Sequence, residues 1–216
     1  MGLAHTTASR AAFITGLSTV LVPLFEFLFF RARFGLAVVL GVLLSFGGLG
    51  LLALSQNAAF TPPGNVLLGD LLVLGCAVSF AFHILSLTHY GKTEESLGLA
   101  AWQTLVVAVL AFPAHASLEP WSLPSPQLWG VIVFLALVAT SLVTVLQIVF
   151  QRFTSATQAA LIFAMEPVFA SGFSFFMQGE TLAPIGFAGC VAMLVGAVVA
   201  SLPRKRNRLA GAETLV

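Results

Sequence analysis

The sequence carries very little charge, and this scarcity is the first clue to its class. Of 216 residues, nine are Lys or Arg and eight are Asp or Glu, so 8% of the chain is charged, while 59% is hydrophobic. A soluble domain carries about a quarter charged residues, so this chain lacks the polar side chains that a surface in water requires. Its net charge of +1 gives no electrostatic reason to expect a nucleic-acid partner.

Residues and motifs for covalent or cofactor chemistry are also scarce. Two cysteines, Cys76 and Cys190, lie inside apolar runs, which indicates small core residues rather than a disulfide framework. His83 and His89 are too far around a helix from each other to share a metal ion. The sequence has no glycine-rich loop for phosphate or dinucleotide binding and no filter motif of a channel. We therefore expect no metal, no cofactor and no catalytic residues.

Long apolar runs dominate the sequence. A helix needs about 20 apolar residues to cross a bilayer, and seven runs of about this length are present. They cover Ala8–Phe30, Phe34–Leu54, Val66–Tyr90, Leu97–Ala116, Leu128–Phe150, Ala156–Met177 and Ile185–Leu202. A β-barrel would need polar and apolar residues in alternation, but Val131 to Ala139 is apolar throughout. The expected fold is therefore an all-α integral membrane protein with about seven transmembrane helices.

Basic residues between the runs predict the orientation of the helices. Lys and Arg collect on the cytoplasmic side of a membrane, which places the tail from Arg204 to Arg208 inside. Every second loop, counted back from the tail, should then be cytoplasmic, and these loops carry Arg152, Lys92 and the pair Arg31 and Arg33. We expect a multi-pass protein of the cytoplasmic membrane whose C-terminus is cytoplasmic.

The sequence repeats itself at an offset of 148 residues. Identical residues at this offset include Ala8 and Ala156, Ala11 and Ala159, Ala12 and Ala160, Ile14 and Ile162, Gly41 and Gly189, and Gly48 and Gly196. The copies begin five spans apart, so one is inverted across the membrane, as in many secondary transporters. We assign residues 1–56 to the last two helices of one five-helix repeat, 65–203 to a complete second repeat and 204–216 to a basic tail. About three helices of the first repeat would then be missing before Met1.

Three segments resemble the EamA-like transporter family of the drug/metabolite transporter superfamily. Thr6 to Leu17, continued by Val22-Pro23-Leu24, is similar to the fourth helix of that family, and Ala159 to Phe169 is similar to the equivalent helix of its second repeat. Gln178 to Leu182, followed by a glycine-rich helix, is similar to the end of that repeat. The first repeat departs from this pattern, because Arg31-Ala32 stands where the second has Gly179-Glu180.

The resemblance implies ten helices in two inverted repeats around a central cavity. It implies a permease that moves small metabolites or drugs by alternating access, with the lipid bilayer, a small-molecule substrate and a proton or cation as partners. If three helices are missing, the alternative is a non-transporting fragment or membrane scaffold, and a homodimer would cover the open face. A more remote alternative is an intramembrane serine protease, because Phe169-Ala170-Ser171-Gly172 is similar to its nucleophile turn without the first glycine.

Glu166 is the strongest candidate for the centre of the cavity. It lies about ten residues into its span, roughly 15 Å deep, where a charged group costs about 2.5–3.5 kcal/mol on insertion scales. Pro167 follows it and leaves the Phe163 carbonyl without its usual helical donor. A carboxylate beside a free carbonyl could hold a proton, a cation or a substrate amine. The structural alternative is a protonated Glu166 that is hydrogen-bonded to a neighbouring helix.

Polar side chains at helical spacing predict the walls of the cavity. Lipid offers these side chains no hydrogen-bond partners, so they should turn toward the bundle interior. The alternative to lining a cavity there is hydrogen bonding between helices. The predicted cavity residues besides Glu166 are Ser79, His83, Ser86, Tyr90, Thr140, Thr144, Gln147, Thr15 and Thr19. Gln151 continues one of these stripes. His83 could serve as a proton relay or as a satisfied core histidine.

Three further sets of residues are expected to be structural. Glu26 lies near the cytoplasmic end of its span, where we expect it to pair with Arg31 or Arg33 or to reach the membrane surface. Asp70 opens the third span, where we expect it to cap the helix or oppose its dipole. The glycines at 41, 48, 186, 189 and 196 indicate close helix packing.

Overall fold

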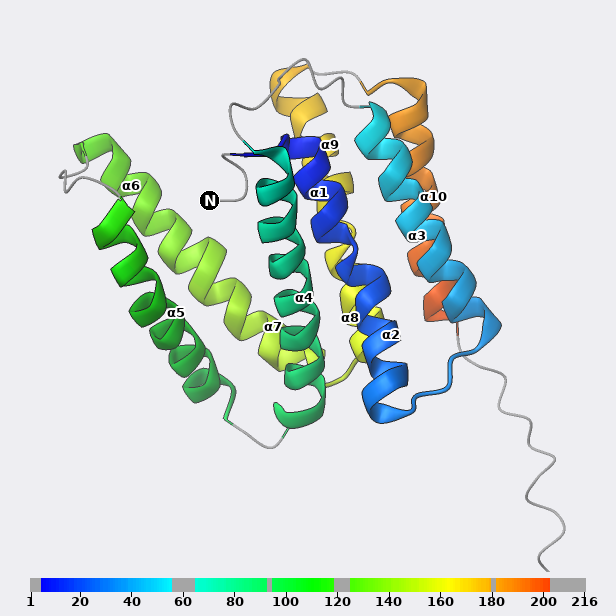
Figure 1. Ribbon diagram of the computed structural model, residues 1–216, viewed down its shortest axis with the longest axis horizontal. Coiled ribbons are helices and arrows are strands. Elements are labelled where there is room, and N and C mark those ends of the chain that lie inside the picture. The colour runs from blue at the N-terminus through cyan, green and yellow to red at the C-terminus, as the bar shows by residue number, and fades with distance from the viewer. Residues whose placement is uncertain (1–4, 56–64, 93–94, 119–124, 180–181, 203–216) are drawn as a thin grey trace, which may run out of the picture. The chain divides into compact units, whose positions relative to one another are not determined.

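The computed structural model describes residues 5–55, 65–92, 95–118, 125–179 and 182–202, and every regular element in these ranges is a helix (Figure 1). Within these ranges, seven helical stretches are long and apolar enough to cross a membrane. They are Arg10–Phe30, Leu36–Ser55, Val66–Tyr90, Ser96–Pro113, Leu128–Gln151, Ala156–Met177 and Pro184–Ser201. The prediction of an all-α membrane protein with seven spans is therefore confirmed. The predicted basic tail lies outside the described residues.

Three of the seven spans are built from more than one element. The elements are α1 (Ala8–Gly16), α2 (Ser18–Phe30), α3 (Leu36–Ser55), α4 (Val66–Tyr90), α5 (Ser96–Leu118), α6 (Pro126–Phe134), η2 (Leu135–Leu142), α7 (Val143–Gln151), α8 (Ala156–Phe163), α9 (Glu166–Gln178) and α10 (Pro184–Ser201). Breaks divide α1 from α2 and α8 from α9, and a π-helical segment, η2, joins α6 to α7. The chain forms two compact units, Met1–Phe82 with Thr157–Val216 and His83–Ala156, which are described separately.

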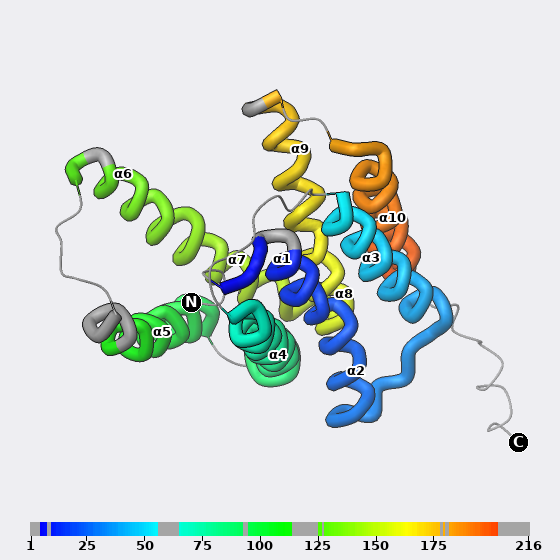
Figure 2. Tube along the Cα trace, turned by 45° about the horizontal axis from the view of Figure 1, so that its top comes forward, coloured from blue at the N-terminus to red at the C-terminus, as the bar shows by residue number. Residues whose placement is uncertain are grey.

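In the first unit, α3 and α10 form an antiparallel pair and lie side by side along their length (Figures 1 and 2). Glycines let the two backbones approach. A Cβ atom added at Gly48 would lie 2.6 Å from the carbonyl oxygen of Gly189, and one added at Gly41 would lie 2.5 Å from that of Gly196. Contacts this close leave no room for a side chain. The prediction that these glycines serve close helix packing is confirmed.

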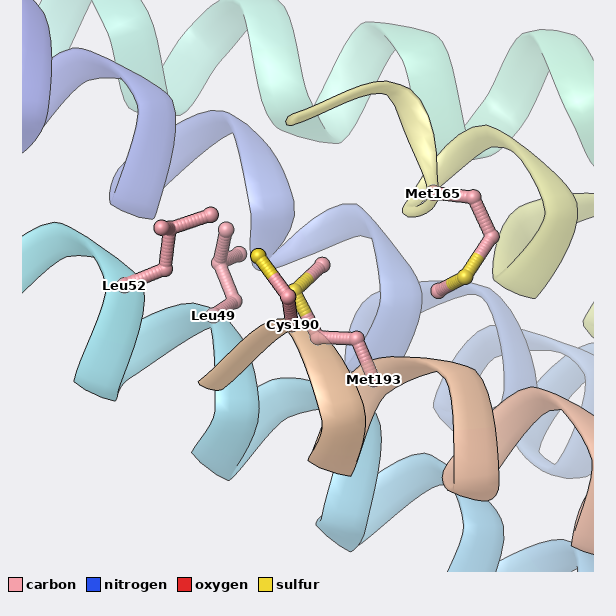
Figure 3. Packing of buried hydrophobic residues seen from close by; sticks show 5 residues of the cluster. All are labelled: Leu49, Leu52, Met165, Cys190 and Met193. Carbon is pink, nitrogen blue, oxygen red and sulfur yellow. The ribbon is translucent and has the colours of Figure 1, made fainter. Parts of the chain in front are cut away.

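The core of the first unit lies against this pair. Its cluster consists of Leu49 and Leu52 from α3, Cys190 and Met193 from α10, and Met165 from the break between α8 and α9 (Figure 3). Met193 is fully buried. Burial of Cys190 agrees with the sequence prediction, but Cys76 is exposed, so the prediction of a core position was wrong for Cys76. An apolar side chain can face lipid as readily as a core, and the apolar run around Cys76 could not distinguish the two.

The offset of 148 residues recurs in the three-dimensional structure of the first unit. Helices α8, α9 and α10 start or end 148 residues after their counterparts: α1 and α8 begin at Ala8 and Ala156, α2 and α9 end at Phe30 and Gln178, and α3 and α10 begin at Leu36 and Pro184. Ser45 Oγ donates a hydrogen bond of 3.3 Å to the carbonyl of Met193, its own counterpart. Because α3 and α10 are antiparallel, the two copies are inverted relative to each other along this pair.

In the second unit, α5 packs on the α6–η2–α7 span. The core of the second unit consists of Leu87 from the end of α4, Ala100 from α5 and Ile148 from α7. The π-helical segment η2 contains Ser141, whose Oγ donates a 2.8 Å hydrogen bond to the carbonyl of Ala136, five residues earlier. This spacing fits the wider turn of a π-helix. Most of η2 is apolar and exposed, as expected for a surface that faces lipid.

Candidate functional site

Glu166 lies at the first residue of α9, where the sixth span is broken. Pro167 has no N–H to donate, and the backbone tightens before it: the Met165 N–H bonds to the Ile162 carbonyl at 3.0 Å, three residues back. The α-helix then restarts, with the Val168 N–H bonded to the Met165 carbonyl at 3.0 Å. Pro167 occupies the first turn of α9, where a helix tolerates proline. The predicted disturbance around Pro167 is thus a full break between two helices.

The Glu166 side chain is exposed near the middle of its span. No residue among those described donates a hydrogen bond to its carboxylate or forms an ion pair with it. The N-terminus of α9 carries the positive end of the helix dipole, which favours a negative group at this position. A carboxylate that is exposed at a helix N-terminus and has no described partner can take up a proton or bind a cation or amine.

The first copy has the same break at the equivalent position. The Leu17 N–H bonds to the Ile14 carbonyl at 3.1 Å, and the Val20 N–H bonds to the Leu17 carbonyl at 2.9 Å, which repeats the pattern around Met165. No proline stands next to this break, since Pro23 lies inside α2. The position equivalent to Glu166 is Ser18, which is buried. Of the two predicted cavity residues nearby, Thr19 is buried and Thr15 is exposed.

In the second unit, a hydrogen-bond network joins the end of α4 to α7. His83 and Gln147 meet at 3.3 Å between their Nε2 atoms, and Gln147 Nε2 donates to Gln151 Oε1 at 3.1 Å. Gln151 Nε2 donates in turn to the Ile84 carbonyl and to Thr88 Oγ1, both at 2.8 Å. Gln151 and Thr88 are buried. We refer to these five residues as the α4–α7 network.

The remaining predicted cavity residues are distributed over both units. Ser79 is exposed and belongs to the first unit, with Glu166, Thr15 and Thr19. Ser86, Tyr90 and Thr140 are exposed and Thr144 is half-buried in the second unit, with His83 and Gln147. An exposed polar residue in a span can line an open pathway, so these positions remain predictions. The described contacts bring together His83 and Gln147.

The role of Thr88 was not predicted from the sequence. Thr88 lies off the stripe that contains Ser79 and His83, so helical spacing gave no signal for it. The available signal was the position of Gln151, which extends the stripe of Thr144 and Gln147 by one turn and needs partners for its buried amide. Its partners come from Ile84 and Thr88, which are themselves four residues apart on α4.

Two polar contacts fasten the α1–α2 span near its ends. Thr157 Oγ1 donates to Glu26 Oε2 at 2.9 Å, and both residues are buried. The hydrogen-bond partner of Glu26 therefore lies on α8, whereas the partners expected from the sequence, Arg31 and Arg33, follow α2. At the other end, Asp70 accepts a 2.6 Å hydrogen bond from Thr6 and forms an ion pair with Arg10.

Asp70 does not cap α4, which was one of the two roles predicted for it; the other role, opposition to the helix dipole, stays a prediction. The side chain that bonds to the first N–H groups of this helix is Asn65, whose Oδ1 accepts from Leu67 N at 3.1 Å and Leu68 N at 3.3 Å. Asp70 lies more than one turn further along and is bound instead by Thr6, which precedes α1, and by Arg10 of α1. The cap was not predicted because Asn65 follows Pro63 and Gly64 in the sequence, and Asn after these residues is equally typical of a turn.

Comparisons with known proteins identify relatives of this chain. The sequence profile of the EamA-like transporter family matches residues 67–202. An uncharacterized transporter of Archaeoglobus fulgidus is 32% identical over 203 residues, which are 94% of this chain and 63% of that protein. The uncharacterized transporter YwfM of Bacillus subtilis is 28% identical over 140 residues, 64% of this chain and 47% of that protein. The chain thus spans less than two thirds of the length of either relative.

A solved crystal structure has the same fold. It superposes with a TM-score of 0.80 at 18% sequence identity, and the match covers 93% of this chain and 69% of that one. Among the described residues of this chain, no group of three or more His, Cys, Asp or Glu side chains lies close enough to hold a metal ion.

Proposed function

Because this chain belongs to the EamA-like transporter family, we propose that it moves a small metabolite or drug across the cytoplasmic membrane by alternating access, with Glu166 as the ionisable centre. The family and the transporter-named relatives point to a transporter rather than an enzyme, and seven apolar helices make the chain a multi-pass membrane protein. The substrate, the coupling ion, the orientation and the site belong to the proposal.

The observation that carries the proposal is the exposed carboxylate of Glu166 at the break between α8 and α9. A charged side chain at this depth costs about 2.5–3.5 kcal/mol on insertion scales, and no described residue compensates it. Lipid is therefore an unfavourable environment for the charged form. A polar pathway that water or a solute enters is the environment that suits an unpaired carboxylate halfway along a span.

The broken spans support the same proposal. Discontinuous helices near the middle of the membrane provide binding sites in many transporters with inverted repeats, because their free ends offer unpaired backbone groups and a local dipole. Here two such breaks, at Leu17 and at Met165, are equivalent under the repeat. Each break separates two shorter helices, and an independent tilt of each would open a pathway first to one side and then to the other.

In the proposed cycle, Glu166 takes up a proton from one side and releases it to the other. The protonated acid lacks the charge that the membrane interior disfavours, so the pathway closes around it more readily. Release of the proton on the far side restores the carboxylate, which can then attract an amine or another cation. Proton movement and solute movement are coupled because both use the same carboxylate.

The test compares Glu166→Gln with the unmodified chain in proteoliposomes. The vesicles are loaded with a mixture of small amines, amino acids and sugars, a pH gradient is imposed, and released solutes are identified by mass spectrometry. Glutamine resembles the protonated acid in size, so the variant should fold, and it should lose transport driven by the gradient. Glu95→Gln, which removes an exposed carboxylate outside the spans, is the matched control and should keep the wild-type rate.

Two results contradict the proposal. Transport by Glu166→Gln at the wild-type rate excludes Glu166 as the group that carries the proton. Absence of any transported solute with the unmodified chain, under gradients of both directions, contradicts transport by this chain and favours the scaffold.

A further inference from the structure

The hydrogen bonds of the α4–α7 network have a fixed donor-to-acceptor direction, which is set at the Ile84 carbonyl. A backbone carbonyl can only accept hydrogen bonds, so the side-chain group of Gln151 that faces the Ile84 carbonyl at 2.8 Å must be its NH₂ group. The second hydrogen of that group goes to Thr88 Oγ1, also at 2.8 Å. Gln151 is buried, and turning its amide over would place two oxygens against each other. Its Oε1 therefore has one direction to face, toward Gln147.

The constraint on Gln151 extends through Gln147 to His83. Gln151 Oε1 can only accept, so Gln147 must present its NH₂ group to it, at 3.1 Å. The same nitrogen of Gln147 lies 3.3 Å from His83 Nε2. An amide nitrogen cannot accept, so His83 Nε2 must be the acceptor and carry no hydrogen. A neutral imidazole with an accepting Nε2 carries its hydrogen on Nδ1.

We propose that Gln151 is a positioning residue that acts through Gln147 to hold His83 in the neutral form with its hydrogen on Nδ1, and that proton uptake at Nε2 releases α7 from α4. The inference deepens the proposed transport function, on which its role in proton coupling rests. It gives the second unit a proton-responsive contact, while Glu166 belongs to the first unit.

Protonation of His83 Nε2 is incompatible with the hydrogen bonds of the network, whichever way the two glutamine amides are turned. A hydrogen on His83 Nε2 would face the NH₂ group of Gln147, so two donors would meet. If Gln147 turned its oxygen toward His83, that oxygen would also meet Gln151 Oε1. If Gln151 turned as well, its oxygen would meet the Ile84 carbonyl, which cannot donate. Separation of the α7 side chains from α4 is what relieves the conflict, since buried polar groups left without partners are unfavourable.

Other titratable residues of the second unit are few and lie mostly near helix ends. On α4 they are His89, whose Nδ1 lies 3.0 Å from the Leu85 carbonyl, and the exposed Tyr90. After α4 the sequence continues with Lys92, Glu94 and Glu95, α5 contains His115, and Glu119 follows α5. The α6–η2–α7 span contributes none before Arg152, which follows its last residue and donates to Ser96 Oγ at 2.6 Å. The partner that the network presents to His83 Nε2 is the uncharged amide of Gln147.

Nitrogen-15 NMR of the histidine rings tests the proposal directly. The chain is labelled at histidine in lipid nanodiscs, and the signals that disappear in His83→Gln are assigned to His83. In the unmodified chain at neutral pH, we expect Nδ1 to show the shift of a protonated nitrogen and Nε2 that of an unprotonated one. Gln151→Leu should lower the ratio of this tautomer to the other about fivefold, as expected for one net hydrogen bond. Thr104→Val, which removes a bond within α5, is the control and should leave the ratio unchanged.

A second variant keeps the proposal testable if Gln151→Leu does not fold. Gln147→Glu replaces the amide by a group that only accepts in its ionised form, so His83 should carry a hydrogen on Nε2. Spin labels at Ser86 on α4 and Phe150 on α7, in a Cys76→Ser and Cys190→Ser background, report the separation. Their distance distribution should lengthen when His83 takes up a proton and should already be longer in Gln151→Leu.

Three results overturn the proposal, and none depends on transport. The first is a His83 that carries its hydrogen on Nε2 in the unmodified chain. The second is an unchanged tautomer ratio in folded Gln151→Leu. The third is an unchanged distance between the labels when His83 becomes protonated. Failure of the Glu166 transport test would leave all three measurements unaffected, so the two proposals fail separately.

Discussion

Arg31 and Gly179 end equivalent helices 148 residues apart, and both adopt the left-handed backbone conformation. Their φ angles are 51° and 68°, and among the described residues no other backbone φ is positive. Arg31 is the cap of α2, and Gly179 is the cap of α9. Glycine adopts this conformation without strain, whereas a residue with a Cβ atom does not. The repeat therefore preserves the backbone geometry of the helix end although the residue type differs.

Replacing these two caps should change stability in opposite directions. Arg31→Gly should raise the free energy of unfolding by up to about 1 kcal/mol, because it removes a left-handed residue with a side chain, and Gly179→Ala should lower it by about 1–2 kcal/mol. Thermal unfolding in detergent measures both. Gly75→Ala is the control, because no atom lies within 4 Å of the added Cβ position, and it should not destabilise. Destabilisation by Arg31→Gly equal to that by Gly179→Ala contradicts this account of the caps.

The close contact of α3 and α10 predicts different effects at two neighbouring glycines. A Cβ at Gly48 would lie 2.6 Å from the Gly189 carbonyl oxygen, whereas nothing lies within 4 Å of one at Gly47. Gly48→Ala should therefore destabilise the chain by about 1–3 kcal/mol, as overpacking does. Gly47→Ala should be neutral or slightly stabilising. Equal melting temperatures for the two variants would show that α3 and α10 do not pack as closely as described.

Thr157→Val should destabilise the first unit because it leaves Glu26 without its donor. Both residues are buried, and Thr157 Oγ1 donates to Glu26 Oε2 at 2.9 Å. A buried acceptor that loses its partner costs about 1–3 kcal/mol. Thr104→Val removes a hydroxyl that bonds within its own helix and serves as the control in the same melting experiment. If the two variants melt alike, the contact between α2 and α8 contributes nothing to stability.

The fold could be predicted from the sequence because the length and apolarity of the runs alone define the spans. The breaks within the spans were harder to predict. Pro167 marks the break between α8 and α9, but the equivalent break at Leu17 has no proline beside it; it follows Gly16, which lies directly against Leu49. The π-helical segment η2 has no signal of its own, because a wider turn in an apolar run does not alter the residue pattern.

Only part of the candidate site could be predicted from the sequence. Helical spacing identified His83 and Gln147 as polar residues of two spans, and the structure brings them together. It could not predict Thr88 or the Ile84 carbonyl, because the partner of a buried amide is set by how far one helix is rotated and shifted along the other. Glu166 was identified by its depth in the span, which a sequence records directly.

The orientation of the chain in the membrane is a separate prediction. The rule that basic loops are cytoplasmic places Lys92 inside and Ser125, which precedes α6, outside. In a background without native cysteines, a membrane-impermeant thiol reagent added to intact cells should modify Ser125→Cys and spare Lys92→Cys. Both residues are exposed, so a difference reflects the side of the membrane. The opposite pattern would reverse the proposed orientation.

Thiol accessibility of Glu166→Cys in the cysteine-free chain shows whether position 166 faces a polar pathway at mid-span. Leu194→Cys is the matched control, since Leu194 is an exposed residue near the middle of the α10 span. A charged, water-soluble thiol reagent requires a thiolate, which forms in contact with water and not in lipid. We predict complete modification of Glu166→Cys in lipid vesicles under conditions that leave Leu194→Cys unmodified. Equal protection of both cysteines would show that Glu166 faces lipid or packed protein, and would contradict the account.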